Sequence, residues 1–101
     1  MNPRIVESQL ESGIINGLTA ALWGNMTLRA GRVQEGNFND QRILRLNETP
    51  QLDVHVIESS ETPGGVGEAA VPPVAPALCN AIFAATGKRL RSLPIMGQKL
   101  I

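Results

Sequence analysis

Large aliphatic side chains recur at every fourth position over the first part of the chain, which is the spacing of one face of an α-helix. The members of this repeat are Val6, Leu10, Ile14, Leu18 and Leu22. Asn2 and Pro3 suit the start of such a helix, and Gly24 suits its end. The chain is therefore predicted to begin with a long helix over residues 3–23. The apolar face of this helix needs a sheet or another helix to cover it.

A second row on the same predicted helix is made of small residues. Gln9, Gly13 and Gly17 follow one another at four-residue spacing. Each glycine inside a helix costs about 1 kcal/mol relative to alanine, so a compensating contact is expected. Another backbone or a bulky ligand would pack on this row, with Gln9 offering a hydrogen-bond donor and an acceptor at one end. The alternative is close packing against a strand, with Gln9 in solvent.

The middle of the chain changes to the pattern of strands. Residues 26–29 and 32–35 flank Ala30-Gly31, a turn-type pair, and predict a short hairpin. Residues 52–58 alternate between apolar and polar side chains and predict a longer strand. Residues 41–46 fit neither the helix period nor the strand period, so either an extended segment or a short helix remains open.

A second helix is predicted near the end of the chain. It begins among the prolines at positions 72, 73 and 76, because proline is tolerated only in the first turn, and it ends at Thr86 before Gly87. Together these elements predict an α+β fold, in which two helices pack on a small, mainly antiparallel sheet.

Composition excludes several classes of function. The chain has 101 residues, enough for one domain, and nine basic residues balance nine acidic ones. With no net charge, neither nucleic acid nor a membrane is an expected partner, and no apolar run is long enough to span a bilayer. The lone cysteine, Cys79, excludes an internal disulfide, and the lone histidine, His55, has no second ligand at a metal-like spacing. A cysteine-based metal site built by this chain alone is therefore excluded, and His55 is expected to be a surface residue.

A glycine-rich loop, residues 63–68, separates the predicted strand from the second helix. Gly64, Gly65 and Gly67 let backbone N–H groups approach a partner closely, and Glu68 follows directly. Glu68 could act as a general base in such a loop. The alternative is a glycine-rich turn with a solvated carboxylate.

Read in order, these motifs resemble the C-terminal part of the molybdenum-binding large subunit of the xanthine dehydrogenase and aldehyde oxidoreductase family, in particular isoquinoline 1-oxidoreductase β subunits. The motifs are residues 2–13, Gly17-Leu18, residues 20–22, residues 31–33, Asn37-Phe38, residues 64–68, Pro76-Ala77, residues 80–82, residues 85–89 and residues 93–95. They cover nearly the whole chain. The sequence departs from the family pattern at Ala69, where proline is usual, and at Gln41, where tyrosine is common.

The resemblance implies roles for particular residues. Glu68 matches the family's general base, which takes a proton from a molybdenum-bound hydroxyl before hydride passes to the metal's sulfido ligand. Gln9 matches a glutamine that hydrogen-bonds the pterin, and Gly65, Val66 and Gly67 match the cofactor-binding loop. The implied cofactor is a molybdenum–pterin in its cytosine dinucleotide form. Its dithiolene, and not the protein, holds the metal.

The resemblance also implies partners. Residues 1–95 would be the C-terminal fragment of a molybdopterin-binding domain, and residues 96–101 a flexible tail. The remainder of the large subunit and a small iron–sulfur (2Fe–2S) subunit would complete the enzyme, which would oxidise N-heterocycles or aldehydes with oxygen from water. The chain alone is expected to be inactive and to bind no cofactor, and its compartment, cytoplasmic or periplasmic, is left open. The alternative is a stand-alone, non-enzymatic protein-interaction module.

Overall fold

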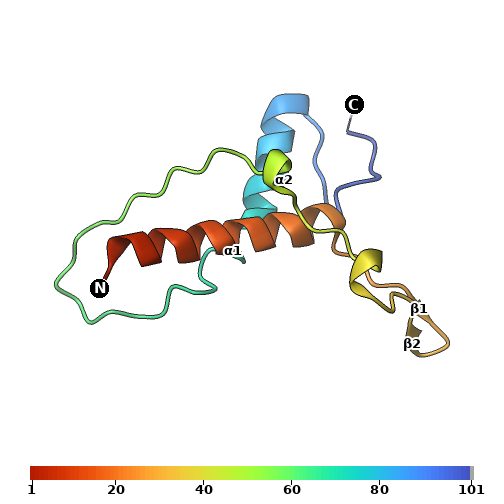
Figure 1. The fold of residues 1–101 in the computed structure, drawn as a ribbon. Coiled ribbons are helices and arrows are strands. Elements are labelled where there is room, and N and C mark those ends of the chain that lie inside the picture. Colours follow the sequence, from red (N-terminus) through yellow and green to blue (C-terminus); the bar gives the residue numbers. More distant parts are fainter. Residues whose placement is uncertain (101) are drawn as a thin grey trace.

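The computed structural model describes residues 1–100, and its longest element is the predicted first helix. This helix, α1, spans Pro3–Trp23 (Figure 1). The Asn2 side-chain oxygen accepts a hydrogen bond from the Arg4 N–H at 3.1 Å, and the Gly24 N–H donates to the Ala20 carbonyl at 2.9 Å. Both ends of α1 are thus capped by the residues that predicted them.

The second predicted helix is also confirmed. This helix, α2, spans Val74–Thr86 and runs across α1 (Figure 1). Gly87 ends it in a left-handed conformation with a φ of 73°, and its N–H donates to the Phe83 carbonyl at 2.8 Å. A left-handed residue at this position is the usual helix stop, and glycine adopts it without steric cost.

The glycine row of α1 lies where the chain enters α2. Gly13 and Gly17 are both buried there. A Cβ placed on Gly17 would lie 2.8 Å from the Val74 Cβ and 3.0 Å from the Val71 carbonyl oxygen. The contact that compensates for the glycines is therefore the backbone and small side chains that lead into α2. A side chain of any size on Gly17 would push the two segments apart.

A small apolar core lies at the C-terminal end of α1. It consists of Ala21, Leu90 and Ile95, with Leu78 and Ile82 of α2 packed against it. The Ile95 N–H donates to the Ala21 carbonyl at 2.9 Å. The next residue, Met96, repeats the pattern on Leu22 at 3.0 Å. These bonds hold the end of the chain along α1, and Ile101 lies outside the described residues.

The predicted hairpin is present. Strands β1, Leu28–Arg29, and β2, Arg32–Val33, pair in antiparallel fashion. Ala30 and Gly31 form the turn with φ values of 49° and 75°, as a tight hairpin turn with the right-handed strand twist requires. The α+β class is thus confirmed. Figure 1 shows that the hairpin projects beyond the end of α1, while the two helices pack on each other.

The predicted strand at residues 52–58 is wrong. Within residues 1–100 this segment pairs with no other strand and forms part of a long loop that runs beside α1 (Figure 1). Alternation along a segment indicates two faces, but a strand also needs a neighbouring backbone for its N–H and C=O groups. No other segment of the described chain offers that neighbour. Residues 41–46 are compatible in sequence with either an extended segment or a short helix. In the structure residues 41–45 are extended and lead into a short 3₁₀ helix, Leu46–Glu48.

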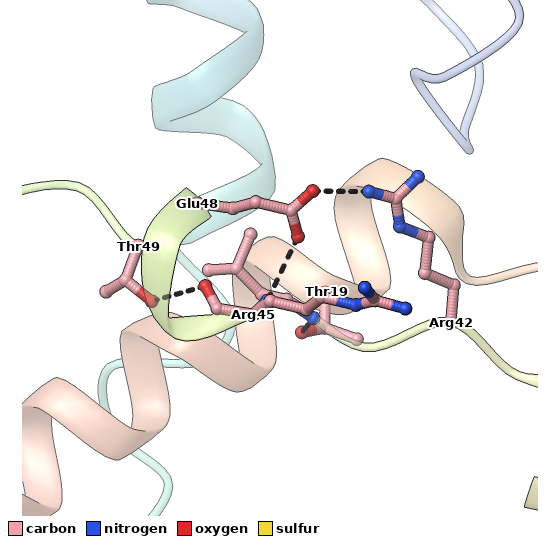
Figure 2. A network of polar contacts seen from close by, with 6 residues as sticks. Thr19, Arg42, Arg45, Glu48 and Thr49 are labelled. Atoms are coloured by element: carbon pink, nitrogen blue, oxygen red, sulfur yellow. Dashed lines mark hydrogen bonds and ion pairs between the residues drawn. The ribbon is translucent and has the colours of Figure 1, made fainter.

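A threonine on α1 anchors the segment after the hairpin (Figure 2). The Thr19 hydroxyl donates to the Ile15 carbonyl at 2.9 Å and accepts from the Leu44 N–H at 3.1 Å. Thr19 thus joins two segments that are far apart in the sequence. Since it is partly buried, its bond to Leu44 is shielded from water on one side.

An ion pair, drawn in Figure 2, and a cation–π contact hold the same segment near the end of α1. The Arg42 guanidinium lies 4.3 Å from the centre of the Trp23 ring and pairs with the Glu48 carboxylate. The Glu48 carboxylate also accepts from the Arg45 N–H at 3.0 Å, which lowers the pKa of Glu48, with Arg42 adding to the effect. A lowered pKa stabilises the fold above the ordinary pKa of glutamate, and this contribution is lost as the pH falls through the lowered value.

The chain exposes more surface than a compact protein of its length. Its accessible surface is 8056 Å², against roughly 5,500 Å² expected from size scaling. Its radius of gyration is 16.4 Å, against about 13 Å for a compact domain. Phe38 and Leu46 are both 94% exposed. The described chain therefore has a small core and a large apolar surface. Neither described helix has the length and apolar character needed to cross a bilayer.

The Gly17 contact predicts that even one added methyl group is harmful. Gly17→Ala should lower the free energy of unfolding by about 1–3 kcal/mol, because the overlap with Val74 outweighs the better helix propensity of alanine. Asn16→Ala, on the exposed side of the same helix turn, is the matched control and should be neutral or slightly stabilising. Thermal unfolding followed by circular dichroism measures both. Equal melting temperatures for the two variants would contradict the contact.

The Thr19 anchor predicts a local effect. Thr19→Val keeps the shape of the side chain but removes the hydroxyl, so the Leu44 amide should exchange with solvent faster, by about fivefold for a bond worth roughly 1 kcal/mol. Thr49→Val removes an exposed hydroxyl bond to the Arg45 carbonyl and should leave Leu44 unchanged. Hydrogen exchange read by NMR decides between them, and an unchanged Leu44 rate in Thr19→Val would show that the anchor does not hold.

Candidate functional site

The glycine-rich loop, residues 63–68, lies beside the N-terminal half of α1. A Cβ placed on Gly67 would lie 3.5 Å from the Gln9 Oε1. The fold thus brings together two predicted site residues that lie far apart in the sequence. An added Cβ at position 67 would be in ordinary van der Waals contact with Gln9, so the Gln9 amide lies beside the loop.

The glycine row on α1 sets the position of this loop. One turn along the helix from Gln9, a Cβ on Gly13 would lie 3.0 Å from the Ala70 Cβ. Ala70 follows Glu68 by two residues, and the Val71 N–H donates to the Glu68 carbonyl at 2.9 Å, which closes a turn. Contacts at Gly13 and Gly17 therefore fix the position of the residues that directly follow Glu68. The glycine-rich loop, which precedes these residues, is thereby held beside Gln9.

The side chains of the predicted site differ in burial. Gln9, Gly65, Gly67 and Glu68 are exposed, and Val66 is half-buried. The Glu68 side chain makes no hydrogen bond to any described residue, while its backbone carbonyl is held by Val71. A carboxylate on a fixed backbone with free oxygens can accept a proton from a bound partner.

A cavity of about 600 Å³ opens beside the loop. Val6 of α1, Val56 and Val66 contribute apolar walls, and the backbone of Gly64 and Gly65 contributes an edge without side chains. A Cβ on either glycine would meet no atom within 4 Å, so the edge is open to a ligand. Glu58 and Glu61 line this cavity, whereas no lysine or arginine of the described chain does, so it offers apolar contact, hydrogen bonds and carboxylates but no side-chain cation.

The remaining reactive side chains lie elsewhere. His55 pairs with Asp53 at 3.2 Å, and both side chains are about 80% exposed, which makes this a surface contact. Cys79 is half-buried against the small core. Arg89 stacks on the Phe83 ring at 3.7 Å and donates to the Asn80 Oδ1 at 2.9 Å, past the end of α2. The described residues contain no cluster of three side chains suited to hold a metal ion.

The loop's seat is the pair of contacts that Gly13 makes with Ala70 and Gly17 makes with Val74. Its residues were predicted only on the α1 side. The glycine row indicated that some backbone packs on α1, but it did not identify Ala70 and Val74 as the partners. A signal was present in the sequence, since Ala69, Ala70 and Val71 form a run of small residues directly after Glu68. Small residues on both sides are what close approach of two backbones requires.

The seat predicts that a bulky side chain at Gly13 loosens the loop. Gly13→Leu should speed hydrogen exchange of the Val71 amide by about tenfold or more, because Ala70 must move away. Ser12→Leu adds the same bulk at an exposed position one residue away and is the matched control. Peptide-resolved hydrogen exchange measures this effect, and a Val71 amide that stays as protected in Gly13→Leu as in Ser12→Leu would contradict the seat.

Comparison with known proteins gives relatives over nearly the full chain, although no family model matches it. The chain is 40% identical to the isoquinoline 1-oxidoreductase β subunit of Brevundimonas diminuta, over 92% of the chain and 12% of that protein. It is 36% identical to a membrane-bound aldehyde dehydrogenase (pyrroloquinoline-quinone) of Gluconacetobacter polyoxogenes, over 94% of the chain and 12% of that protein. It is 30% identical to a xanthine dehydrogenase molybdenum-binding subunit of Escherichia coli, over 99% of the chain and 14% of that protein.

These matches bear directly on the resemblance predicted from the motifs. They extend from the first helix through the glycine loop to the end of α2, because each covers more than nine-tenths of the chain. The chain spans only 12–14% of the length of these relatives. The resemblance is thus confirmed, and the chain is related over nearly its whole length to a short part of isoquinoline 1-oxidoreductase β subunits and xanthine dehydrogenase molybdenum-binding subunits.

Proposed function

We propose that this chain is the part of a molybdenum hydroxylase large subunit that supplies the catalytic base and one wall of the cofactor site. The observation that supports the proposal is the approach of Gln9 to Gly67, which brings a side chain of α1 beside the loop that precedes Glu68. In this proposal residues 1–95 are the C-terminal fragment of a molybdopterin-binding domain. The isolated chain is inactive, because most of the site belongs to the remainder of the subunit.

The residues of this surface fit a pterin cofactor. The Gln9 amide can donate and accept hydrogen bonds, which suits the mixed donors and acceptors of a pterin ring. The open backbone edge at Gly64 and Gly65 allows a flat group to approach closely. A molybdenum–pterin, in its cytosine dinucleotide form, supplies when bound the metal at which the substrate is hydroxylated. No basic side chain lines the cavity. The phosphate groups of this cofactor must therefore be neutralised by residues outside this chain.

Glu68 is assigned the role of general base. Its carboxylate makes no hydrogen bond to any described residue, and its backbone is held by the turn to Val71. In the described chain Glu68 is open to solvent. A base next to a reacting centre works best where bulk water is excluded, so the remainder of the subunit must cover this side of the loop.

The proposed substrate is an N-heterocycle or an aldehyde, oxidised with oxygen from water. The relatives are named for isoquinoline, aldehyde and xanthine, which share an electron-poor carbon next to a ring nitrogen or within a carbonyl group. The proposed partners are the remainder of the large subunit and a small iron–sulfur (2Fe–2S) subunit. One relative carries a quinone cofactor in its name, so metal analysis of the assembled enzyme is the first test of the cofactor class.

The role of Glu68 can be tested in a chimera in which this chain replaces the matching region of the Brevundimonas diminuta subunit. Glu68→Gln should leave the molybdenum content near that of the parent chimera, while turnover falls by a factor of about 10²–10⁴, because glutamine cannot take the proton. Glu11→Gln, at an exposed glutamate of α1 that does not line the cavity, is the matched control and should keep full turnover. A Glu68→Gln chimera that retains most of its activity would refute the assignment.

A further inference from the structure

An open apolar groove lies between the two helices, on a part of α1 that the glycine loop does not cover. Its volume is about 490 Å³. Its main lining side chains are all aliphatic: Ile14, Leu18, Val74, Ala77, Leu78 and Ala81. No charged residue of the described chain lines it. Ala77 and Ala81 are exposed to solvent in the chain as it stands.

Such a groove is unfavourable in water. Each Å² of apolar surface that a partner covers contributes about 25 cal/mol. A patch without any charge is also typical of a permanent contact and not of a transient, polar one. The groove belongs to a chain that already exposes far more surface than its length predicts. These features indicate a partner that stays in place.

We propose that the groove receives an apolar segment from the remainder of the large subunit. This inference rests on the proposed function. The relatives extend well beyond the 12–14% of their length that matches this chain, so the polypeptide that could supply the segment is part of the same subunit. The groove has no side-chain charge to select a charged or nucleic-acid partner.

The same contact acts on the candidate site. Ala70 and Val74 line the groove, and they are also the residues that touch Gly13 and Gly17. A segment in the groove, between Ile14 and Leu18 of α1 and the face of α2, therefore also contacts the residues that hold the loop against α1. Docking of the remainder of the subunit thus fixes the backbone after Glu68 in the assembled protein.

Thiol labelling tests whether the groove becomes covered. Ala77→Cys places a thiol in the groove, and Asn80→Cys places one on another face of α2, each in a Cys79→Ala background. Both are labelled with iodoacetamide in the isolated chain and in the Brevundimonas diminuta chimera, with mass spectrometry to locate the label. In the chimera the labelling rate of the thiol at position 77 should fall by a factor of about ten or more. The labelling rate at position 80 should change by less than about twofold.

Three results would overturn the proposal. The thiol at position 77 could react as fast in the chimera as in the isolated chain, or both positions could be protected alike. Protection of position 77 in the isolated chain that grows with concentration would instead identify a second copy as the occupant. Where the chimera does not assemble, a cysteine at the aligned position of the Brevundimonas diminuta subunit provides the same measurement.

The experiment separates this inference from the proposed function. Labelling reports burial and does not depend on turnover. An active chimera with an unprotected position 77 would refute the groove alone. An inactive chimera without molybdenum but with a protected position 77 would refute the function and leave the docking surface in place.

Discussion

The close contact between the glycine row of α1 and the chain entering α2 is the interaction on which the candidate site depends. Gly13 meets Ala70, and Gly17 meets Val74 and the Val71 carbonyl, at distances that leave no room for a Cβ at Gly17. These residues lie directly after Glu68. The contact therefore does more than hold two helices together, since it determines where the loop leaves α1 and hence that Gln9 lies beside Gly67.

The rest of the molecule shows how little the described chain stabilises itself. Its core is a few side chains where α1, α2 and the C-terminal segment meet, while large apolar residues such as Phe38 and Leu46 are almost fully exposed. Burial of apolar surface is the main favourable term in folding, and backbone entropy opposes it. A chain with this balance is well suited to be one part of a larger packed assembly, which agrees with its short match to much longer relatives.

Local features were predictable and long-range ones were not. Both ends of α1 and the end of α2 follow from Asn2, Gly24 and Gly87, because a cap acts within one turn of its helix. The hairpin follows from Ala30-Gly31, because a tight turn also acts only on the residues next to it. The strand predicted at residues 52–58 is wrong because alternation describes a single segment, whereas a strand requires a second segment to pair with. Among residues 1–100 that second segment is missing, and Figure 1 shows an extended loop in its place.

By itself the sequence determined the two helices, the hairpin turn, the chemical types of the candidate site and the family that its motifs resemble. It also indicated that something must pack on Gly13 and Gly17, since interior glycines weaken a helix. Only the tertiary structure decided that Ala70 and Val74 are the partners, that Gln9 meets Gly67, and that an apolar groove remains open between the helices. The physical reason is that these contacts join residues far apart in the chain, and their geometry depends on how two helices cross, which no local pattern of residues specifies.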